Sequence, residues 1–244
     1  MPDIIELCNV SFSAQSRRLV HGVSFSFEEG KTTALVGPSG GGKSTVLKLA
    51  AGLIAPDEGE ALFRGKEIAR MNRQENLAFR REAAFVFQDS ALWANQNLFQ
   101  ILELPLRLHF PEMKQKDRER RIESVAADVG YKKDLGIRPS QLSMGEQKLI
   151  AFARAMICYP RLLFLDEWTE SLDENASQRL IELVKKFHSQ GVTIILISHD
   201  IRIIRDLADV AVMILGGKIF LRITRDQIAD DEDLGRYIER GMAS

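Results

Sequence analysis

Cysteine is scarce in this sequence. Only Cys8 and Cys158 occur among the 244 residues, and they lie far apart with no CxxC spacing. Disulfide-stabilised secreted domains and structural zinc sites both need several cysteines at short intervals. We therefore expect neither, and this cysteine usage fits a reducing compartment best.

Long apolar runs and a secretion signal are also missing. No stretch reaches the roughly 18 consecutive apolar residues from which a membrane-spanning helix is built. The N-terminal residues MPDIIELCNV carry Asp3 and Glu6 where a signal peptide would carry basic residues, and no apolar core follows. The sequence predicts a cytoplasmic chain that does not cross a membrane by itself.

An excess of either charge is absent as well. The 33 basic and 34 acidic residues leave a formal net charge of −1, which gives no reason to expect nucleic-acid binding. Hydrophobic residues make up 45% and charged residues 27% of the chain, as in ordinary globular domains. No repeat, low-complexity segment or Gly/Ser linker divides the 244 residues, which suffice for one large α/β domain or two small ones.

What the sequence does contain is a succession of short apolar runs that alternate with helical patterns. Such alternation is typical of a parallel sheet covered by helices on both faces. Between about residues 89 and 160 the helical period dominates, which indicates a helical region inserted into the α/β core. The expected strands are residues 4–13, 22–30, 32–37, 83–88, 161–167, 192–199 and 210–215, and the expected helices are 43–54, 114–130, 174–189 and 201–208.

A glycine-rich loop, GPSGGGKST, follows an apolar run, opens a helical pattern and matches GxxxxGK[ST]. Backbone N–H groups of such a loop and of the following helix start bind the β- and γ-phosphates of a nucleotide. The lysine adds positive charge, and the serine hydroxyl can ligate Mg²⁺. The alternative, a glycine turn with a chance lysine, is disfavoured by the strand–loop–helix context. The predicted phosphate-binding residues are Gly37, Pro38, Ser39, Gly40, Gly41, Gly42, Lys43, Ser44 and Thr45.

Two adjacent carboxylates end the apolar run RLLFLDE at residues 161–167. At such a strand tip Asp166 would hold Mg²⁺ through water, as phosphoryl-transfer sites require. Glu167 points elsewhere and can orient and polarise the water that attacks the γ-phosphate. A solvated strand end is the alternative, and the glycine loop at 37–45 disfavours it.

Two further polar side chains follow apolar runs. His199 lies just beyond IILIS, near the sheet edge where ligands collect, and can contact the γ-phosphate and position the water. Gln88 ends AAFVFQ and offers an amide oxygen to Mg²⁺ or water. Taken alone, neither residue is specific.

Taken together, the order of these elements resembles that of the ATP-binding subunit of ABC transporters, from about residue 4 to residue 225. Several independent short motifs occur in the family's order. They are Walker A at 37–45, the Q-loop glutamine at Gln88, the signature at 142–146, Walker B at 162–166, the catalytic glutamate at Glu167, the D-loop at 171–173 and the switch histidine at His199.

The resemblance implies a fold class and a domain plan. The fold would be α/β, a P-loop NTPase core with a mainly parallel sheet, an N-terminal antiparallel β portion and an inserted α-helical subdomain. The chain would form a single nucleotide-binding domain over residues 1–244. Its α/β core would comprise about 1–88 and 160–244, and the helical subdomain about 89–159.

The resemblance also implies ATP hydrolysis by a head-to-tail pair of subunits around two ATP molecules. A second copy of an ABC ATPase subunit is then one partner, because the signature helix of each chain faces the ATP held by the other. The residues assigned in this way are Ser143, Gly145, Glu146 and Asp173 for ATP, Ser44, Gln88 and Asp166 for Mg²⁺, and Glu167 and His199 for catalysis.

A separate transmembrane permease subunit is the second implied partner, and it would place the chain on the cytoplasmic face of the inner membrane. The stretch FQDSALWANQNLFQILELPL is similar to the ATPase of bacterial Mla-type lipid transporters, which favours a lipid cargo. Its residues Leu92, Trp93, Leu98 and Phe99 lie where the family forms the permease groove, near Gln88 to Phe99. Trp93 could equally belong to the core of the helical subdomain.

Some residues depart from the family pattern. The signature usually reads Leu-Ser-Gly-Gly-Gln, whereas this chain has Met144 and Glu146 within it. A carboxylate at a helix start suits the helix dipole but would repel a phosphate if it pointed inward. Trp168 replaces the proline that commonly follows the catalytic glutamate.

Adenine binding is affected by another departure. Ala14 stands where an aromatic ring often stacks on adenine, so Phe12 or Phe25 would have to substitute. Two alternative functions stay open beside transport, and Met144, Glu146 and Ala14 motivate the second of them. One is an ABC-type ATPase that acts on a transmembrane partner without transport, as in cell division, and the other is an ATP-binding module without hydrolysis.

Overall fold

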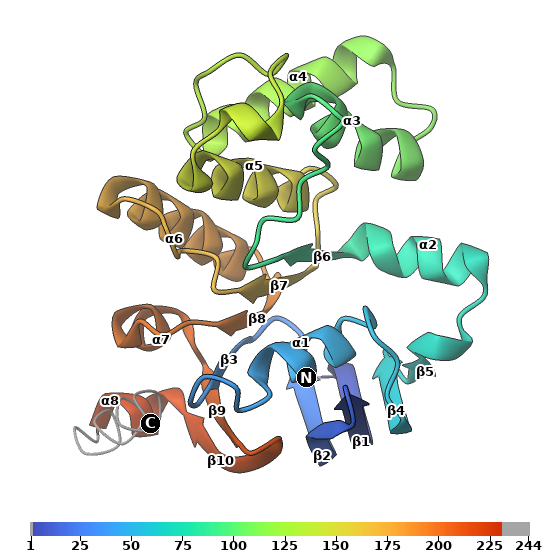
Figure 1. Cartoon of the computed structure of the whole chain (residues 1–244), viewed down its shortest axis with the longest axis vertical. Coiled ribbons are helices and arrows are strands. Elements are labelled where there is room, and N and C mark those ends of the chain that lie inside the picture. Colours follow the sequence, from blue (N-terminus) through green and yellow to red (C-terminus); the bar gives the residue numbers. More distant parts are fainter. Residues whose placement is uncertain (1, 231–244) are drawn as a thin grey trace.

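The structure, a computed structural model, describes residues 2–230 of the chain (Figure 1). Two sheets and eight α-helices occur in this part, and α3, α4 and α5 gather at the end of the molecule opposite the antiparallel strands. The expected α/β fold, with a mainly parallel sheet, an N-terminal antiparallel portion and added helices, is confirmed. The boundaries of the helical subdomain, about 89–159, stay a prediction.

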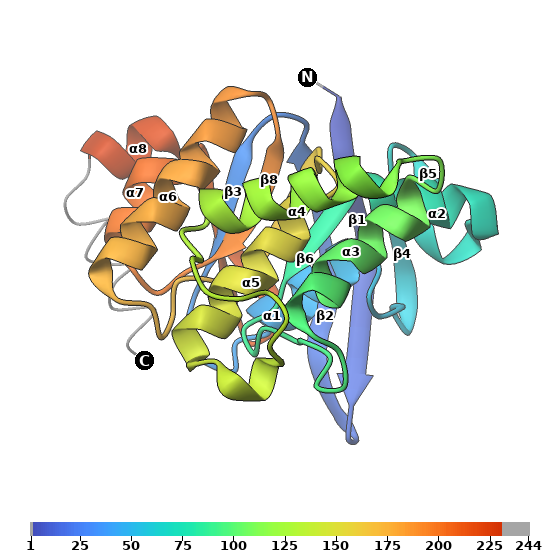
Figure 2. The same cartoon turned by 90° about the horizontal axis from the view of Figure 1, so that it is seen from above.

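The N-terminal sheet has four strands in the order β2-β1-β4-β5, and its neighbouring strands are antiparallel. The hairpin of β1 and β2 projects from the rest of the molecule (Figure 2). Its turn consists of Gln15 and Ser16, both at positive φ, as the tightest hairpin turns require. The second strand therefore starts earlier than predicted. The strands are β1 (Asp3–Ala14), β2 (Arg17–Glu28), β4 (Glu58–Phe63) and β5 (Lys66–Glu67).

The second sheet has six strands in the order β10-β9-β3-β8-β7-β6. The strands β9, β3, β8, β7 and β6 are parallel, and β10 pairs with β9 in the antiparallel direction. Every residue of β3, β7 and β8 is buried, which explains why these strands are continuous apolar runs. The strands are β3 (Thr32–Val36), β6 (Ala83–Val86), β7 (Leu162–Asp166), β8 (Thr193–Ile197), β9 (Val210–Leu215) and β10 (Lys218–Thr224).

The four predicted helices are found as α1, α4, α6 and α7, whereas α2 and α8 have no counterpart among the predictions. Phe79 is the one residue of α2 that is buried, so no apolar face marks this helix in the sequence. A capping box between Asn72 and Glu75 starts it. The helices are α1 (Lys43–Ala50), α2 (Arg73–Glu82), α3 (Leu98–His109), α4 (Gln115–Asp128), α5 (Met144–Met156), α6 (Glu174–Ser189), α7 (Ile201–Leu207) and α8 (Arg225–Asp230), with 3-10 turns at Ile68–Arg70 and Pro139–Gln141.

The parallel sheet has a hydrophobic core on each face. Side chains alternate along β7, so that Leu163 and Leu165 pack toward one core and Leu162 and Phe164 toward the other. The first core also receives buried residues of α3, α4, α5 and α6, and the second receives those of α1 and the antiparallel sheet. Each large apolar side chain buried in this way contributes roughly 1.5–3 kcal/mol.

Because β3, β6, β7 and β8 are parallel, the loops that leave their carboxyl ends meet at one edge of the sheet. Those loops carry the glycine loop, Gln88, Glu167 and His199. The fold thus brings together residues that are far apart in the sequence. Among residues 2–230, no helix is long and apolar enough to cross a bilayer.

Candidate functional site

The glycine loop lies tightly between β3 and α1. Gly37 has φ 136° and Gly42 has φ 102°, values that favour glycine. A Cβ atom at Gly37 would lie 2.2 Å from the carbonyl oxygen of Ile214 in β9, so no larger residue fits there. The loop conformation therefore depends on glycine at these two positions and on contact with β9.

The first turn of α1 is open to a ligand. Its N-cap residue is Gly42, no side chain caps the helix within the described residues, and no acidic residue lies in the first turn. The first N–H groups of a helix have no partner inside the helix and carry partial positive charge. This helix start can therefore bind an anion such as a phosphate.

The side chain of Lys43 folds back across the inside of the glycine loop. Its ammonium donates hydrogen bonds to the carbonyl oxygens of Gly37 at 2.7 Å and Pro38 at 2.9 Å. Burial lowers the pKa of Lys43, and the nearby carboxylates of Glu167 and Asp166 oppose that shift. The positive charge thus lies inside the loop that would hold the phosphates.

Ser44 and Asp166 lie side by side across the sheet edge. The Ser44 hydroxyl donates to Oδ1 of Asp166 at 3.1 Å. Burial raises the pKa of Asp166, while the bond from Ser44 and nearby lysines oppose this shift. Hydroxyl and carboxylate oxygens are ligands that Mg²⁺ prefers, so this pair fits a nucleotide-bound magnesium ion.

Glu167 is held at the centre of a polar network. Its Oε1 atom lies 2.8 Å from Nε2 of His199, and its Oε2 atom accepts a hydrogen bond from Nε2 of Gln88 at 2.8 Å. The same Gln88 nitrogen donates to Oε2 of Glu170 at 3.1 Å. The structure therefore brings together the predicted Gln88, Glu167 and His199, and adds Glu170.

Glu170 was missed by the sequence reasoning, because nothing in the sequence but its place three residues after Glu167 marks it. The two carboxylates share one environment. Burial raises the pKa of Glu167, and the neighbouring Glu170 raises it further. Burial alone would raise the pKa of Glu170 as well, but hydrogen bonds with Gln88 and Glu167 lower it overall. A raised pKa makes the Glu167 carboxylate a better proton acceptor near neutral pH.

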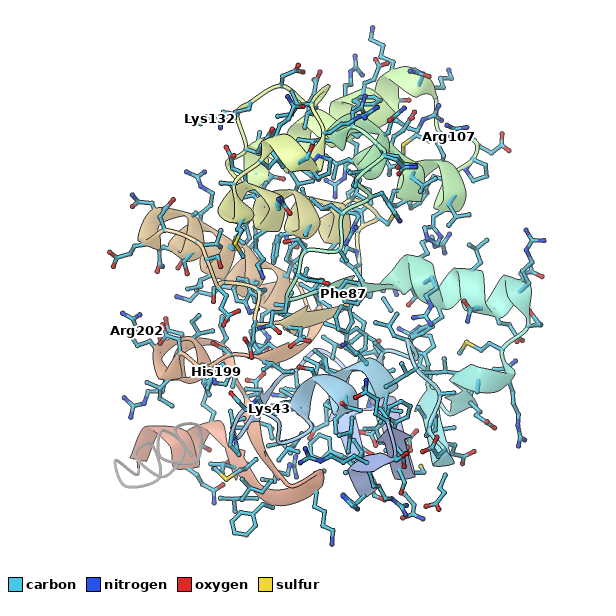
Figure 3. All side chains as sticks on the ribbon, in the orientation of Figure 1. Lys43, Phe87, Arg107, Lys132, His199 and Arg202 are labelled. Atoms are coloured by element: carbon cyan, nitrogen blue, oxygen red, sulfur yellow. The ribbon has the colours of Figure 1, made fainter. Side chains whose placement is uncertain are left out.

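Most of these residues line one cavity of about 580 Å³, whereas Asp166 is not among its lining residues. Lys43 and His199 lie in the central part of the molecule, far from Lys132 on the helical end (Figure 3). Gly37, Pro38 and Gly41 shape the loop but do not line this cavity. Its lining residues are Leu19, Ser39, Gly40, Gly42, Lys43, Ser44, Thr45, Gln88, Glu167, Glu170 and His199.

The predicted adenine-stacking substitutes lie elsewhere. Phe25 packs edge-on against Phe27, with 4.9 Å between the ring centroids, and lines a different hollow on the antiparallel sheet. The prediction that Phe25 could stack on adenine is therefore wrong. Phe12 packs against the core beneath that sheet. Among the described residues it is Leu19 of β2, an aliphatic side chain, that the antiparallel sheet contributes to the phosphate-side cavity.

The signature residues lie outside this cavity. Ser143 is the N-cap of α5, and its Oγ atom accepts a hydrogen bond from the Glu146 N–H. The Glu146 carboxylate accepts from the Ser143 N–H and pairs with Lys133 at 2.6 Å. Met144 is 71% exposed. The carboxylate is thus turned to its own helix end, and Lys133 and the Ser143 N–H lower its pKa.

Gly145 and Asp173 also lie away from the cavity of their own chain. A Cβ atom at Gly145 would lie 3.1 Å from the carbonyl oxygen of Ser171, so the signature helix packs closely on the D-loop. The Asp173 carboxylate caps α6 by accepting from the Ala176 N–H at 2.9 Å. One chain alone therefore does not assemble all predicted ATP-binding residues at one place.

Trp168 fills the position where the family usually has proline. It is fully buried, and its ring lies 5.7 Å from the ring of Phe152 in α5. Its Nε1 atom has no hydrogen-bond partner among the described residues. The residue after Glu167 therefore anchors the loop that follows β7 to α5.

The four residues expected in the permease groove differ in how far they are exposed on the surface. Trp93 is 43% exposed, with the Arg154 guanidinium 5.5 Å from its ring centroid, so Trp93 is a surface residue. Leu92 and Phe99 are partly buried against the core. Leu98 is fully buried, so its prediction as a groove residue is wrong, because it is an anchor of the helical core.

Comparison with known proteins agrees with this geometry. Residues 20–170 match the family described as ABC transporter. The nickel import ATP-binding protein NikE of Shigella flexneri serotype 5b is 33% identical over 233 residues, covering 93% of this chain and 87% of that protein. The intermembrane phospholipid transport system ATP-binding protein MlaF of Haemophilus influenzae is 31% identical over 233 residues, covering 95% and 88%.

A solved structure supports the same assignment. The ATP-binding cassette MJ0796, a dimer in a post-hydrolysis state bound to ADP and phosphate, superposes with a TM-score of 0.84 at 26% identity. The match covers 91% of this chain and 98% of that one. This chain therefore belongs to the ABC transporter family, as an ATP-binding subunit with ATPase activity.

Proposed function

We propose that this chain is the motor subunit of a transporter and works as a head-to-tail pair that closes around two ATP molecules. The observation that carries the proposal is the division of the site. Glu167, with His199 and Gln88, lies at the cavity of the glycine loop, whereas Ser143 lies outside it. The MJ0796 relative, solved as a dimer, supports pairing.

In this proposal the residues of the cavity divide the work. The open helix start of α1 and the Lys43 ammonium bind the phosphates of ATP. The oxygen of a water molecule bonds to the γ-phosphorus, the bond from that phosphorus to the ADP oxygen breaks, and Glu167 accepts the water proton. His199 holds one carboxylate oxygen of Glu167, and Gln88 holds the other.

The residues present also fit Mg²⁺. Ser44 and Asp166 would hold the ion, with Gln88 as the third proposed ligand. The ion, when bound, would neutralise charge on the phosphate oxygens.

The test of this mechanism is Glu167→Gln. The amide keeps the shape and the contact with Gln88 but cannot accept a proton, so we expect the ATP turnover number to fall about 100-fold or more. ATP binding should persist, and ATP-dependent dimers should accumulate on size exclusion with light scattering. Glu123→Gln, on the exposed side of α4, is the matched control and should turn over like the parent.

Turnover of Glu167→Gln within twofold of the parent would contradict the proposed role of Glu167 as proton acceptor. Lack of ATP-dependent dimers, at normal turnover of the parent, would instead remove the head-to-tail pairing. The two parts of the proposal are therefore separable in one set of measurements.

A transmembrane permease is the proposed membrane partner, and it would place the chain on the cytoplasmic face of the inner membrane. Trp93, five residues after Gln88 in the sequence, offers an exposed aromatic anchor, and the Arg154 guanidinium lies over its ring. Aromatic and arginine side chains carry much of the binding energy in protein interfaces. The names of the relatives support transport over a partner without transport.

For the cargo we propose a lipid, on the similarity of residues 87–106 to Mla-type ATPases and on the phospholipid transport relative MlaF. The NikE relatives favour a second candidate, a nickel ion. The chain should be purified with its membrane partner, and its ATPase rate measured with phospholipid vesicles and with Ni²⁺. Stimulation by Ni²⁺ alone would replace lipid by metal, and stimulation by neither would favour the role without transport.

A further inference from the structure

Lys148 is a lysine in the interior of the protein. It lies in α5, five residues after the helix N-cap Ser143, and is only 3% exposed. Lysine is rarely buried unless its ammonium is paired or hydrogen-bonded. Its position therefore needs a structural reason, and none of the roles proposed so far includes it.

The ammonium of Lys148 reaches two loops of the catalytic edge. It donates to the carbonyl oxygen of Gln88 at 2.5 Å and lies 3.3 Å from the carbonyl oxygen of Glu167. Gln88 follows β6 and Glu167 follows β7, so one side chain connects both loops to α5. These are the loops that carry a proposed metal ligand and the proposed catalytic carboxylate.

The backbone at Glu167 needs such support. Its φ of 45° lies in the left-handed region, which a residue with a side chain adopts only when surrounding contacts hold it. The N–H of Glu167 donates to Ile197 in β8, and its carbonyl oxygen accepts from Lys148. The strained peptide is thus fixed from both sides, by the sheet and by the signature helix.

Charge also favours the lysine at this place. Burial lowers the pKa of Lys148, and the carboxylates of Glu170, Glu167, Asp166 and Asp89 oppose this shift. Arg154, six residues further along α5, donates to the carbonyl oxygens of Ala91 and Ser90. It supports the Gln88 loop alone, whereas Lys148 is the residue of α5 whose side chain also contacts the Glu167 backbone in the described structure.

We propose that Lys148 is a positioning residue for ATP hydrolysis, which holds Gln88 and Glu167 in a fixed relation to the start of the signature helix. This inference rests on the proposed head-to-tail mechanism. The helix start that meets the ATP of one site and the carboxylate that acts at the other site then belong to one connected unit. Movement of α5 on dimer closure is transmitted to Glu167 through this side chain.

The experiment compares three variants of the full-length chain. Lys148→Met keeps the length of the side chain without a donor, Lys148→Gln keeps a donor without the charge, and Lys116→Met makes the first change at an exposed site of α4. ATP affinity is measured by fluorescence titration, turnover by steady-state assay, and dimer formation on the Glu167→Gln background.

For Lys148→Met we expect a turnover number at least tenfold lower, with ATP affinity and ATP-dependent dimerisation within twofold of the parent. The turnover number of Lys148→Gln should lie between those of the parent and Lys148→Met, and Lys116→Met should match the parent. This division between turnover and binding is one that general loss of packing would not produce. If Lys148→Met does not fold, as shown by circular dichroism, the same comparison is made with Lys148→Gln.

Turnover of the folded variant within twofold of the parent would overturn the inference. Equal losses of turnover, ATP affinity and dimerisation would overturn it as well, because Lys148 would then only stabilise the fold. Failure of the parent itself to hydrolyse ATP or to dimerise would count against the proposed function instead.

Discussion

The helices α1 and α5 both begin with residues proposed to bind ATP, yet their first turns are built in opposite ways. In α1 the N-cap is Gly42, with no side-chain cap and no acidic residue in the first turn. In α5, Ser143 and Glu146 form a complete capping box. The N–H groups of α1 are thus left for a ligand, whereas part of those of α5 are already bound within the chain.

In the proposed mechanism this difference means that the two helix starts act at different stages of ATP binding. The first turn of α1 is ready for phosphate in a single chain, because no group of the described chain has to be displaced from it. The first turn of α5 is stabilised by its own cap, and in the proposed dimer it meets ATP only when a second chain arrives. Glu146 is the residue that makes this cap acidic, and Lys133 offsets its charge.

Lys43→Met changes the uncapped start of α1 and should give the largest effect of the substitutions that test this comparison. Removing the ammonium deletes a charged hydrogen-bond donor to phosphate, worth about 1.5–3 kcal/mol, so the Kd for ATP should rise roughly 10- to 100-fold. Fluorescence titration of the single chain measures this change, with Lys116→Met as control. A Kd within twofold of the parent would mean that Lys43 only braces Gly37 and Pro38.

Glu146→Gln tests the capped side and should have an intermediate effect. The amide can still accept from the Ser143 N–H, but one negative charge near the incoming phosphates is lost, so ATP-dependent dimers should form at about three- to tenfold lower chain concentration, a difference of roughly 1 kcal/mol. ATP affinity of the single chain should not change. Light scattering on the Glu167→Gln background measures the dimers.

The same substitution has a pH signature. The folded pKa of Glu146 is lowered from an ordinary value of 4.5, first by Lys133 and then by the Ser143 N–H. Its ion pair therefore stabilises the fold above pH 4.5, and this contribution is lost as the pH falls through the lower folded value. Glu146→Gln should melt slightly lower than the parent at pH 7 and equally in acid. An unchanged difference in acid would mean that charge is not the cause.

Met144→Gly should give the smallest effect and sharpen the comparison. Met144 is largely exposed at the first position of α5, so a glycine there should cost at most about 1 kcal/mol of helix stability. Dimerisation and ATP affinity should stay within twofold of the parent. If Met144→Gly changed dimerisation more than Glu146→Gln, side-chain bulk rather than capping would distinguish α5 from α1.

Much of the site could be predicted because its residues directly follow buried strands. The glycine loop, Asp166 with Glu167, and His199 end continuous apolar runs, and parallel pairing brings those ends together whatever the intervening chain does. For the same reason the two central strands that carry Glu167 and His199 are found close to their predicted places.

Other residues could not be predicted, because their surroundings depend on packing. Glu170 reaches Gln88 only through the turn that follows Glu167, and Lys148 is charged in a helix where burial is decided by two distant loops. The aliphatic Leu19 lines the phosphate-side cavity, and nothing in the sequence marked it as a site residue. The strand β10 escaped prediction because its residues are mostly exposed, so no continuous apolar run marks it.

The strand that leads into the glycine loop, β3, pairs with strands that come much later in the sequence. β3 ends at Val36, but the strands on its two sides, β8 and β9, lie at residues 193–197 and 210–215. A chain made from its N-terminus must therefore expose this central strand until most of the protein has left the ribosome. Nucleotide has no finished phosphate loop to stabilise before that point, since β9 itself packs against Gly37. A weakened β9 would thus lower the yield of folded protein during synthesis, because the phosphate loop cannot be completed without it.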